Sequence, residues 1–176
     1  RIFSYVLHKH GKPVRVCPFR NGWGNDELMF DSAGIGVPAI SIDRYPFPQY
    51  HTHYDDMSNF NSGKMDEIVD LFLEAADLIE RDFVPRPVNR LPVYLTRYEL
   101  YSDWTWERDM YDMSQKIIDN LFSERSIADI AFEHDIDLDY ALEYAGKYID
   151  LGLVNRTEIN PGYTRDIRFL PNFNKE

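Results

Sequence analysis

The stretch GVPAISID, residues 36–43, indicates the fold class. It is apolar and rich in β-branched side chains, and a proline near its start suits the opening of a buried strand. Residues 14–19 predict an earlier strand, and the loop 44–61 leads into a helix over about residues 64–82. Two strands flanked by helices predict part of an α/β sheet domain that spans residues 1–82.

The predicted helix at 64–82 is apolar along one face. The residues of this face recur at helical spacing: Met65, Ile68, Val69, Phe72, Ala75, Ala76 and Ile79. Ser62 is a suitable N-cap for the helix. A second helical pattern, Ile2 to Leu7, opens the chain without a capping residue. We therefore expect the chain to be a fragment of a longer protein.

A proline-rich segment follows, FVPRPVNRLPVYL at residues 83–95. Three prolines in thirteen residues forbid a regular helix and favour an extended linker. The sequence therefore predicts a domain boundary here, which separates residues 1–82 from residues 96–176.

Residues 96–176 show a different pattern, with three helices followed by a β-hairpin. The first helix covers about residues 104–122, Ser126 caps a short second helix, and Asp137 caps a third helix that ends at Gly152. The segments LVNRTEI and RDIRFL flank the turn NPGY and predict the hairpin. This order predicts a winged helix-turn-helix domain.

The composition limits the possible partners. The 176 residues carry 30 acidic and 19 basic side chains, a net charge of -11, so we do not expect nucleic acid to be a partner. Residues 96–176 alone hold seventeen acidic and nine basic residues. No apolar run reaches the roughly 20 residues of a membrane span. The single cysteine, Cys17, cannot form an internal disulfide, and a cytoplasmic location fits.

The loop sequence YHTHYDD, residues 50–56, concentrates polar chemistry where the chain should turn. Asp26 follows the first predicted strand and His51 follows the second. Both loops could emerge at the carboxyl edge of an open sheet, where ligands bind. Zinc takes imidazole nitrogen and carboxylate oxygen, but a catalytic zinc needs at least three protein ligands. From the residues alone, a metal site and a polar loop with satisfied histidines both remain open.

Residues 24–56, GNDELMFDSAGIGVPAISIDRYPFPQYHTHYDD, resemble the C-terminal stretch of zinc-dependent aminopeptidases of the bacterial leucyl aminopeptidase type. The matching motifs are Gly24-Asn25-Asp26, Gly36-Val37-Pro38, and Tyr50-His51-Thr52 with Asp55. The pair Asp26-Glu27 is similar to a bacterial subgroup of aminopeptidase-like proteins, sometimes encoded among polysaccharide-biosynthesis genes. That subgroup also carries a winged helix after its peptidase-like domain, so the resemblance covers the whole chain.

The resemblance implies a two-metal zinc centre that hydrolyses an amide or peptide bond. Asp26 would bind one zinc and His51 the other, while Thr52 and Asp55 would orient the His51 ring. Three further residues would face the substrate: Glu27, Tyr50 and His53.

The family also needs an upstream histidine, a bridging aspartate and a pair of glutamates, one of which is the general base. Residues 1–25 match none of these motifs, so we expect no catalytic general base in this chain and place it upstream. The first alternative is a non-catalytic aminopeptidase-fold protein whose winged helix mediates protein interaction or self-association. The second is a winged-helix DNA regulator, which the acidic charge disfavours.

Overall fold

The computed structural model describes residues 1–17, 26–30, 35, 37, 39–43 and 46–159. Its helices are α1 (Ile2–Lys9), α2 (Glu27–Phe30), α3 (Ser62–Arg81), α4 (Arg108–Asn120), α5 (Ile127–His134) and α6 (Leu138–Asp150). Two short 3-10 helices cover Met57–Asn59 and Leu95–Tyr98, and the strands are β1 (Val84–Pro87) and β2 (Val154–Thr157). The described residues thus form a mixed fold of helices with one small antiparallel sheet.

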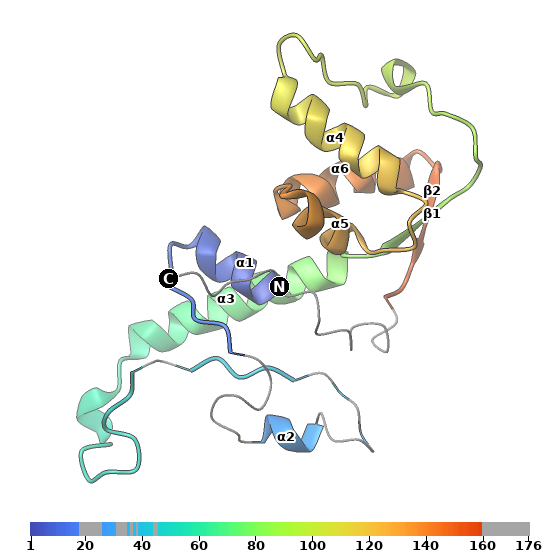
Figure 1. Ribbon diagram of the computed structural model, residues 1–176. Coiled ribbons are helices and arrows are strands. Elements are labelled where there is room, and N and C mark those ends of the chain that lie inside the picture. The colour runs from blue at the N-terminus through green and yellow to red at the C-terminus, as the bar shows by residue number, and fades with distance from the viewer. Residues whose placement is uncertain (18–25, 31–34, 36, 38, 44–45, 160–176) are drawn as a thin grey trace.

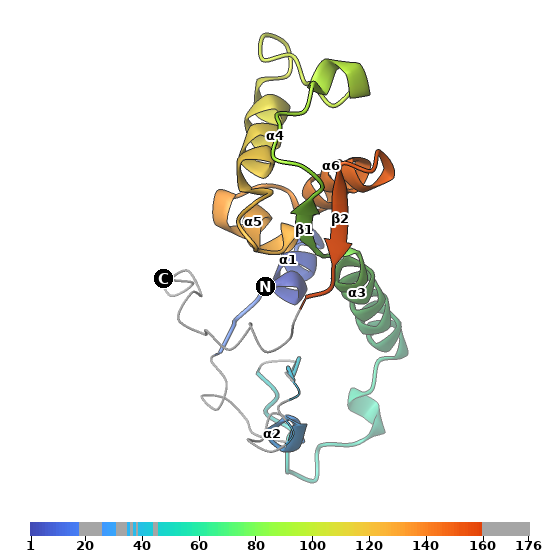
Figure 2. The same ribbon diagram turned by 90° about the vertical axis from the view of Figure 1, so that its right-hand side faces the viewer.

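The long helix α3 connects the two parts of the molecule (Figure 1). Helix α1 packs along α3, and the helices α4, α5 and α6 gather beyond the C-terminal end of α3. In both views, α2 lies at the opposite end of the molecule from α4 (Figures 1 and 2). We call residues 96–159 the helical half.

Helix α3 begins slightly earlier than the sequence predicts. Its N-cap is Asn61, whose side chain accepts from the backbone N–H of Lys64 at 3.1 Å, so the expected cap Ser62 is instead the first helical residue. The buried residues of α3 are Leu71, Ala75 and Leu78. With the exception of Ala75, the apolar face predicted from the spacing is exposed. Helix α1 packs against α3, and Leu78 on the neighbouring face shares a core with Ile127 and Ile130 of α5.

The two strands predicted near the N-terminus are not strands in the described residues. Residues 14–17 and 39–43 have no ladder partner, and Ile40 is 57% exposed rather than buried. An extended segment becomes a strand only when a neighbour pairs with its backbone groups, and no such neighbour lies among the described residues. The described residues of 1–82 therefore do not show the expected α/β sheet.

The proline-rich segment 83–95 does contain a strand. Strand β1 pairs with β2 in antiparallel register, with Val84 opposite Thr157 and Pro87 opposite Val154 (Figure 2). Prolines are tolerated in an edge strand because their missing N–H groups can face away from the ladder. The expected linker is thus extended, but its first residues are part of the fold. The second strand of the expected hairpin, residues 165–170, lies outside the described residues.

The three helices predicted for the helical half are confirmed. Ser126 caps α5 by accepting from the N–H of Asp129, and Asp137 caps α6 by accepting from the N–H of Tyr140. Gly152 follows α6 with a φ of 66°, the left-handed conformation that favours glycine. Helix α4 starts at Arg108, four residues later than expected.

One hydrophobic core joins the two sides of the predicted boundary. It includes Val6 of α1 and Leu78 of α3 together with Ile127 and Ile130 of α5. The buried carboxylate of Asp82, directly after α3, accepts from the backbone N–H groups of Phe83 and Ala128, each at 2.9 Å. This carboxylate therefore ties the end of α3 to the beginning of α5.

Candidate functional site

Asp26 lies in the turn that leads into α2. Its carbonyl oxygen accepts from the N–H of Met29 at 2.9 Å, which holds the first turn of the helix, and its side chain is exposed. Glu27 is the first residue of α2. The structure thus places Asp26 at the beginning of a short helix, on a surface that a ligand can reach.

His51 adopts an uncommon backbone conformation. Its φ is 60°, in the left-handed region, where residues other than glycine are infrequent. Its side chain is exposed, and the imidazole stacks on the ring of Tyr50 with 4.0 Å between centroids and 19° between planes. Tyr50 in turn lies against Phe47, at 6.1 Å between centroids. Aromatic rings therefore support the His51 ring on one side.

Thr52 organises the loop around His51. Its hydroxyl donates to the carbonyl of Gln49 at 2.7 Å and accepts from the N–H of Tyr54 at 3.2 Å. The N–H of Asp55 donates to the carbonyl of Thr52 at 3.2 Å. These bonds hold the backbone that carries His51, whereas we expected Thr52 and Asp55 to act on the ring itself.

His53 and Asp56 lie beside His51 in the sequence but have other contacts. The His53 ring packs on Tyr54 at 3.9 Å between centroids. The Asp56 carboxylate accepts from the N–H and the hydroxyl of Ser58, at 2.8 and 2.6 Å, and so caps the 3-10 helix Met57–Asn59. The hydroxyl and then the N–H of Ser58 lower the pKa of Asp56 below its usual value. Asp56 is thus a structural cap.

The described residues do not assemble a complete metal site. Among them, no group of three or more His, Cys, Asp or Glu side chains has the arrangement to hold a metal ion. Asp26 and His51 therefore amount to at most a partial ligand set within this part of the chain.

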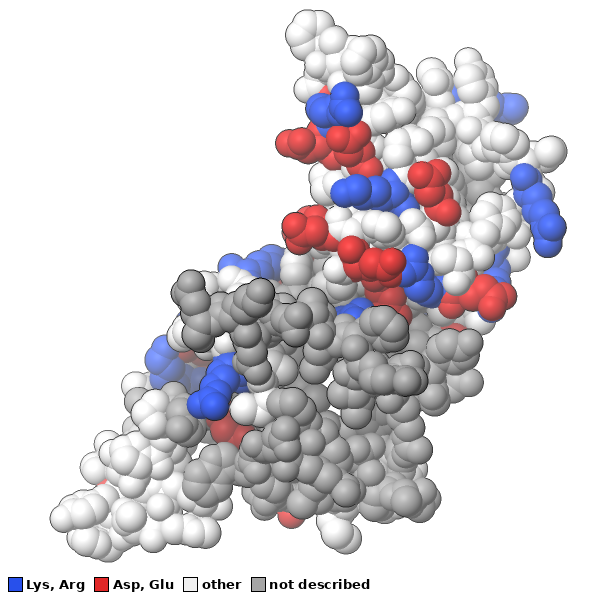
Figure 3. Space-filling model, viewed as in Figure 1, with Lys and Arg blue, Asp and Glu red and all other residues white. Residues whose placement is uncertain are grey.

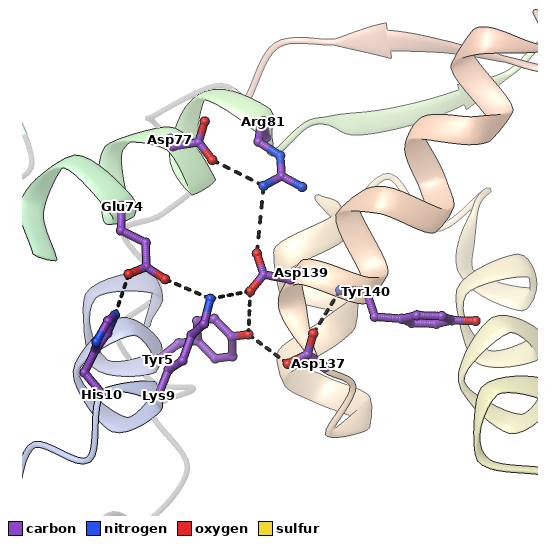
Figure 4. A network of polar contacts seen from close by, with 9 residues as sticks. All are labelled: Tyr5, Lys9, His10, Glu74, Asp77, Arg81, Asp137, Asp139 and Tyr140. Atoms are coloured by element: carbon purple, nitrogen blue, oxygen red, sulfur yellow. Dashed lines mark hydrogen bonds and ion pairs between the residues drawn. The ribbon is translucent and has the colours of Figure 1, made fainter. Parts of the chain in front are cut away.

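A second cluster of polar side chains, which the sequence did not predict, joins α1, α3 and α6 (Figure 4). The Lys9 ammonium contacts Glu74 at 2.8 Å and Asp139 at 2.7 Å. The Tyr5 hydroxyl donates to Asp137 at 2.8 Å, and His10 Nε2 contacts Glu74 at 2.6 Å. The bonds to Asp139 and then Glu74 raise the pKa of Lys9. We call these residues, together with Arg81, the α1–α3–α6 network.

The network engages the first turn of α6. Asp137 is the N-cap of this helix and Asp139 lies in its first turn, where negative charge suits the helix dipole. Arg81 near the end of α3 adds a contact to Asp139 at 3.8 Å. These contacts occupy the beginning of the helix that would enter a DNA groove in a winged helix.

The surface charge of the helical half is mixed. Figure 3 shows lysine and arginine side chains interspersed with acidic ones on the viewed face, without a continuous basic patch there. Arg156 of β2 donates to the backbone carbonyls of Glu80 and Asp82 and lies over the ring of Phe83. Arg156 therefore bonds β2 to the C-terminal end of α3. Arg165 and Arg168 lie outside the described residues.

Comparison with known proteins relates this chain to peptidase-like proteins. A family model described as a domain of unknown function (DUF4910) matches residues 1–82. A Clostridium acetobutylicum protein named "Putative polysaccharide biosynthesis protein with aminopeptidase-like domain" is 33% identical over 84 residues, which is 47% of this chain and 19% of that protein. The chain is thus similar to this relative over about half of its own length.

A crystal structure described as a "putative peptidase" from Clostridium acetobutylicum has a similar fold. The superposition has a TM-score of 0.57 at 21% sequence identity and covers 89% of this chain and 35% of the other. The present chain thus spans about a fifth of the curated relative and about a third of the solved chain. Within the described residues, no helix combines the length and apolar character needed to cross a membrane.

Proposed function

We propose that this chain is the C-terminal part of a zinc-dependent, aminopeptidase-like hydrolase, in which Asp26 binds one zinc and His51 the other. The relative with a named aminopeptidase-like domain and the peptidase-like fold support the class of protein. The motif residues around Asp26 and His51 support the choice of ligands.

The observation that carries the proposal is the conformation of His51. A left-handed backbone at a residue other than glycine stores strain of about 1–3 kcal/mol and persists where the surroundings impose it. Here the Thr52 hydroxyl and the turn that starts at Gln49 hold this backbone, and the ring stays exposed on Tyr50. A histidine held in this way keeps an accessible ring nitrogen for a ligand.

Zinc, when bound, would polarise the scissile carbonyl and lower the pKa of a bridging water. Asp26 would contribute a carboxylate oxygen and His51 an imidazole nitrogen. Thr52 would hold the loop, with Asp55 beside it, and the substrate would be a peptide or another amide that passes Glu27, Tyr50 and His53. Two ligands are fewer than a catalytic zinc takes. The remaining ligands and the general base would therefore come from polypeptide outside this chain.

Metal analysis of the full-length gene product tests the proposal. The purified protein at neutral pH should hold zinc, and His51→Ala should lower the zinc content because one ion loses a ligand. His53→Ala is the matched control, since it removes a neighbouring imidazole that packs on Tyr54, and it should keep the zinc. A protein without zinc, or equal zinc content in both variants, would refute the metal site.

The second candidate is a non-catalytic protein that uses this fold as a scaffold, with residues 96–176 as a winged helix for protein contacts. The α1–α3–α6 network favours it, because the first turn of α6 already contacts α1 and α3. The same contacts and the acidic charge argue against a DNA regulator. A titration with double-stranded DNA at low salt should therefore show no binding. A salt-dependent affinity would instead support a DNA-binding function.

A further inference from the structure

Two tryptophans are exposed in the segment that leads into α4. Trp104 is 57% exposed and Trp106 is 85% exposed, while Tyr101 and Met110, close to them in the sequence, are 45% and 42% exposed. In both views this segment lies at the end of the molecule opposite α2 (Figures 1 and 2). We call residues 101–110 the tryptophan segment. Indole rings left in water to this extent are typical of contact surfaces, where tryptophan is enriched.

The backbone of the tryptophan segment is held by hydrogen bonds. The Asp103 carboxylate accepts from the N–H of Thr105 at 2.7 Å. The Asp103 carbonyl accepts from the N–H groups of Trp106 and Glu107, at 3.1 and 2.7 Å. An aspartate in this role is typical of a tight turn. The turn lies between the buried residue Leu100 and the beginning of α4. Because its backbone is already ordered, the segment loses little conformational entropy when it binds a partner.

The same surface is acidic. Residues 99–112 carry five acidic side chains and one basic side chain, Arg108, which pairs with Asp112 at 3.0 Å. The other four acidic side chains are exposed and have no ion-pair partner among the described residues: Glu99, Asp103, Glu107 and Asp109. Exposed indole rings therefore share this surface with negative charge that no basic side chain of the described chain pairs.

This charge decides among the partners that indole rings attract. Nucleic acids and anionic membranes both present phosphate groups, which the carboxylates repel. A cation suits both features, because an indole face attracts an ammonium or guanidinium group and the neighbouring carboxylates add ion pairs. Tryptophan attracts cations more strongly than the other aromatic side chains do. The chain contains one weaker contact of this type, with the Arg97 guanidinium 5.5 Å from the centroid of the Tyr98 ring.

We propose that the tryptophan segment binds a cationic segment of another protein, rich in arginine and lysine. The rings of Trp104 and Trp106 contact the cationic groups, and the carboxylates of Glu107 and Asp109 pair with them. A second copy of this chain is a poorer partner, because it carries a net charge of -11. The proposal names a partner for the protein contacts of the second candidate function, and it does not depend on the zinc site.

A labelled peptide of alternating arginine and glycine residues tests the surface, with binding to the full-length gene product followed by fluorescence anisotropy. The chain as a whole is acidic, so the comparison of variants carries the test. Trp106→Ala should weaken binding by about fivefold or more, since it removes a cation–π contact. Phe122→Ala is the matched control, because Phe122 is 56% exposed beyond the other end of α4, and it should leave the affinity unchanged.

A second pair of variants tests the charge. Glu107→Gln should weaken binding of the same peptide at low salt and have a smaller effect at high salt, because it removes an ion pair that salt screens. Asp119→Asn is the control, since Asp119 is an exposed carboxylate near the other end of α4. All of the substituted side chains are exposed, so the variants should unfold at the Tm of the wild type. A loss of affinity then reports on binding and not on folding.

Equal affinities within either pair of variants, or a gene product that does not bind the peptide, would overturn the proposal. Binding of cellohexaose or of phosphatidylserine vesicles that depends on Trp106, without binding of the peptide, would also overturn it, because the partner would then be a glycan or a membrane. A dimer of the gene product that Trp106→Ala dissociates would assign the surface to a second copy and overturn it as well. Zinc content does not enter these measurements, so this proposal and the metal site can fail independently.

Discussion

Lys9 of α1 and Asp139 of α6 are joined by an ion pair of 2.7 Å, although 130 residues separate them in the chain. Both side chains are about 40% exposed, so water and salt weaken the pair. Its value lies in its position, because it connects the N-terminal helix to the first turn of α6. The pair offers a direct measure of how firmly the helical half is held.

A double-mutant cycle should detect this coupling. We expect Lys9→Ala and Asp139→Ala to show an interaction energy of about 0.5–1 kcal/mol at low salt, and less at high salt. Urea unfolding provides the free energies. The control is the pair Lys147 and Glu143, which lies within α6 at 3.3 Å and should couple by about 0.3 kcal/mol. Equal coupling in the two pairs would mean that the network does not help to hold α6 against α1.

The contribution of Asp82 to the free energy of unfolding should change with pH in the opposite sense to that of a typical surface aspartate. Burial raises its pKa, and bonds from Ala128, Ser126 and Phe83 only partly offset this. The folded state then binds a proton more readily than the unfolded state. Stability from this group is therefore present at low pH and lost as pH rises through the raised folded pKa.

Substitutions at Asp82 can separate the charge from the hydrogen bonds. Asp82→Asn keeps an acceptor for Phe83 and Ala128 and removes the titration, so it should unfold with a free energy equal to or above the wild type at pH 7. Asp82→Ala leaves those N–H groups unpaired and should cost about 1–3 kcal/mol. Urea unfolding at acid and neutral pH measures both. An asparagine variant as unstable as the alanine variant at pH 7 would contradict this account.

Glu74 should stabilise the fold at neutral pH and lose this contribution at acid pH. Bonds from Lys9 and then His10 lower its pKa. Its contribution is therefore present above the unfolded pKa and is lost as pH falls through the folded pKa. Glu74→Gln should flatten the acid limb of a stability curve measured by urea unfolding between pH 7 and 3. Asp150→Asn serves as a control at an exposed carboxylate of α6, and it should leave that limb unchanged.

The hydroxyl of Tyr144 should contribute to the stability of the fold. The hydroxyl is buried and donates to the carbonyl of Leu100 at 2.9 Å, which ties the segment before α4 to α6. Tyr144→Phe keeps the ring and should lower the free energy of unfolding by about 1 kcal/mol. Tyr101→Phe changes a partly exposed tyrosine nearby and should have little effect. The prediction fails if thermal unfolding shows the same Tm for both variants.

Local signals in the sequence predicted the helices well. Ser126 and Asp137 mark the beginnings of α5 and α6, and Gly152 marks the end of α6, because each acts on backbone groups within a few residues. The helical spacing of the apolar residues in α3 could also be recognised in the sequence. The sequence did not show which side of α3 is buried, because that depends on α1 and on core residues of α5, which come from distant parts of the chain.

Features that depend on distant partners were not predictable in the same way. The prolines of β1 indicated a linker, and only its pairing with β2, about 70 residues later, makes it a strand. Lys9, Glu74 and Asp139 carry no motif, and tertiary packing brings them together. For Asp26 and His51 the sequence motif remains the main argument, and their role as metal ligands remains a prediction.

The ladder between β1 and β2 also has a topological consequence. It places the beginning and the end of residues 84–157 on adjacent strands, about 5 Å apart, as in a β-hairpin whose turn has been replaced by a 3-10 helix and three α-helices. A segment with neighbouring ends can be inserted into, or removed from, a host protein without displacing the host backbone. Excision of residues 84–157 would therefore leave neighbouring ends to rejoin, but it would also uncover Val6 and Leu78, which share one core with Ile127.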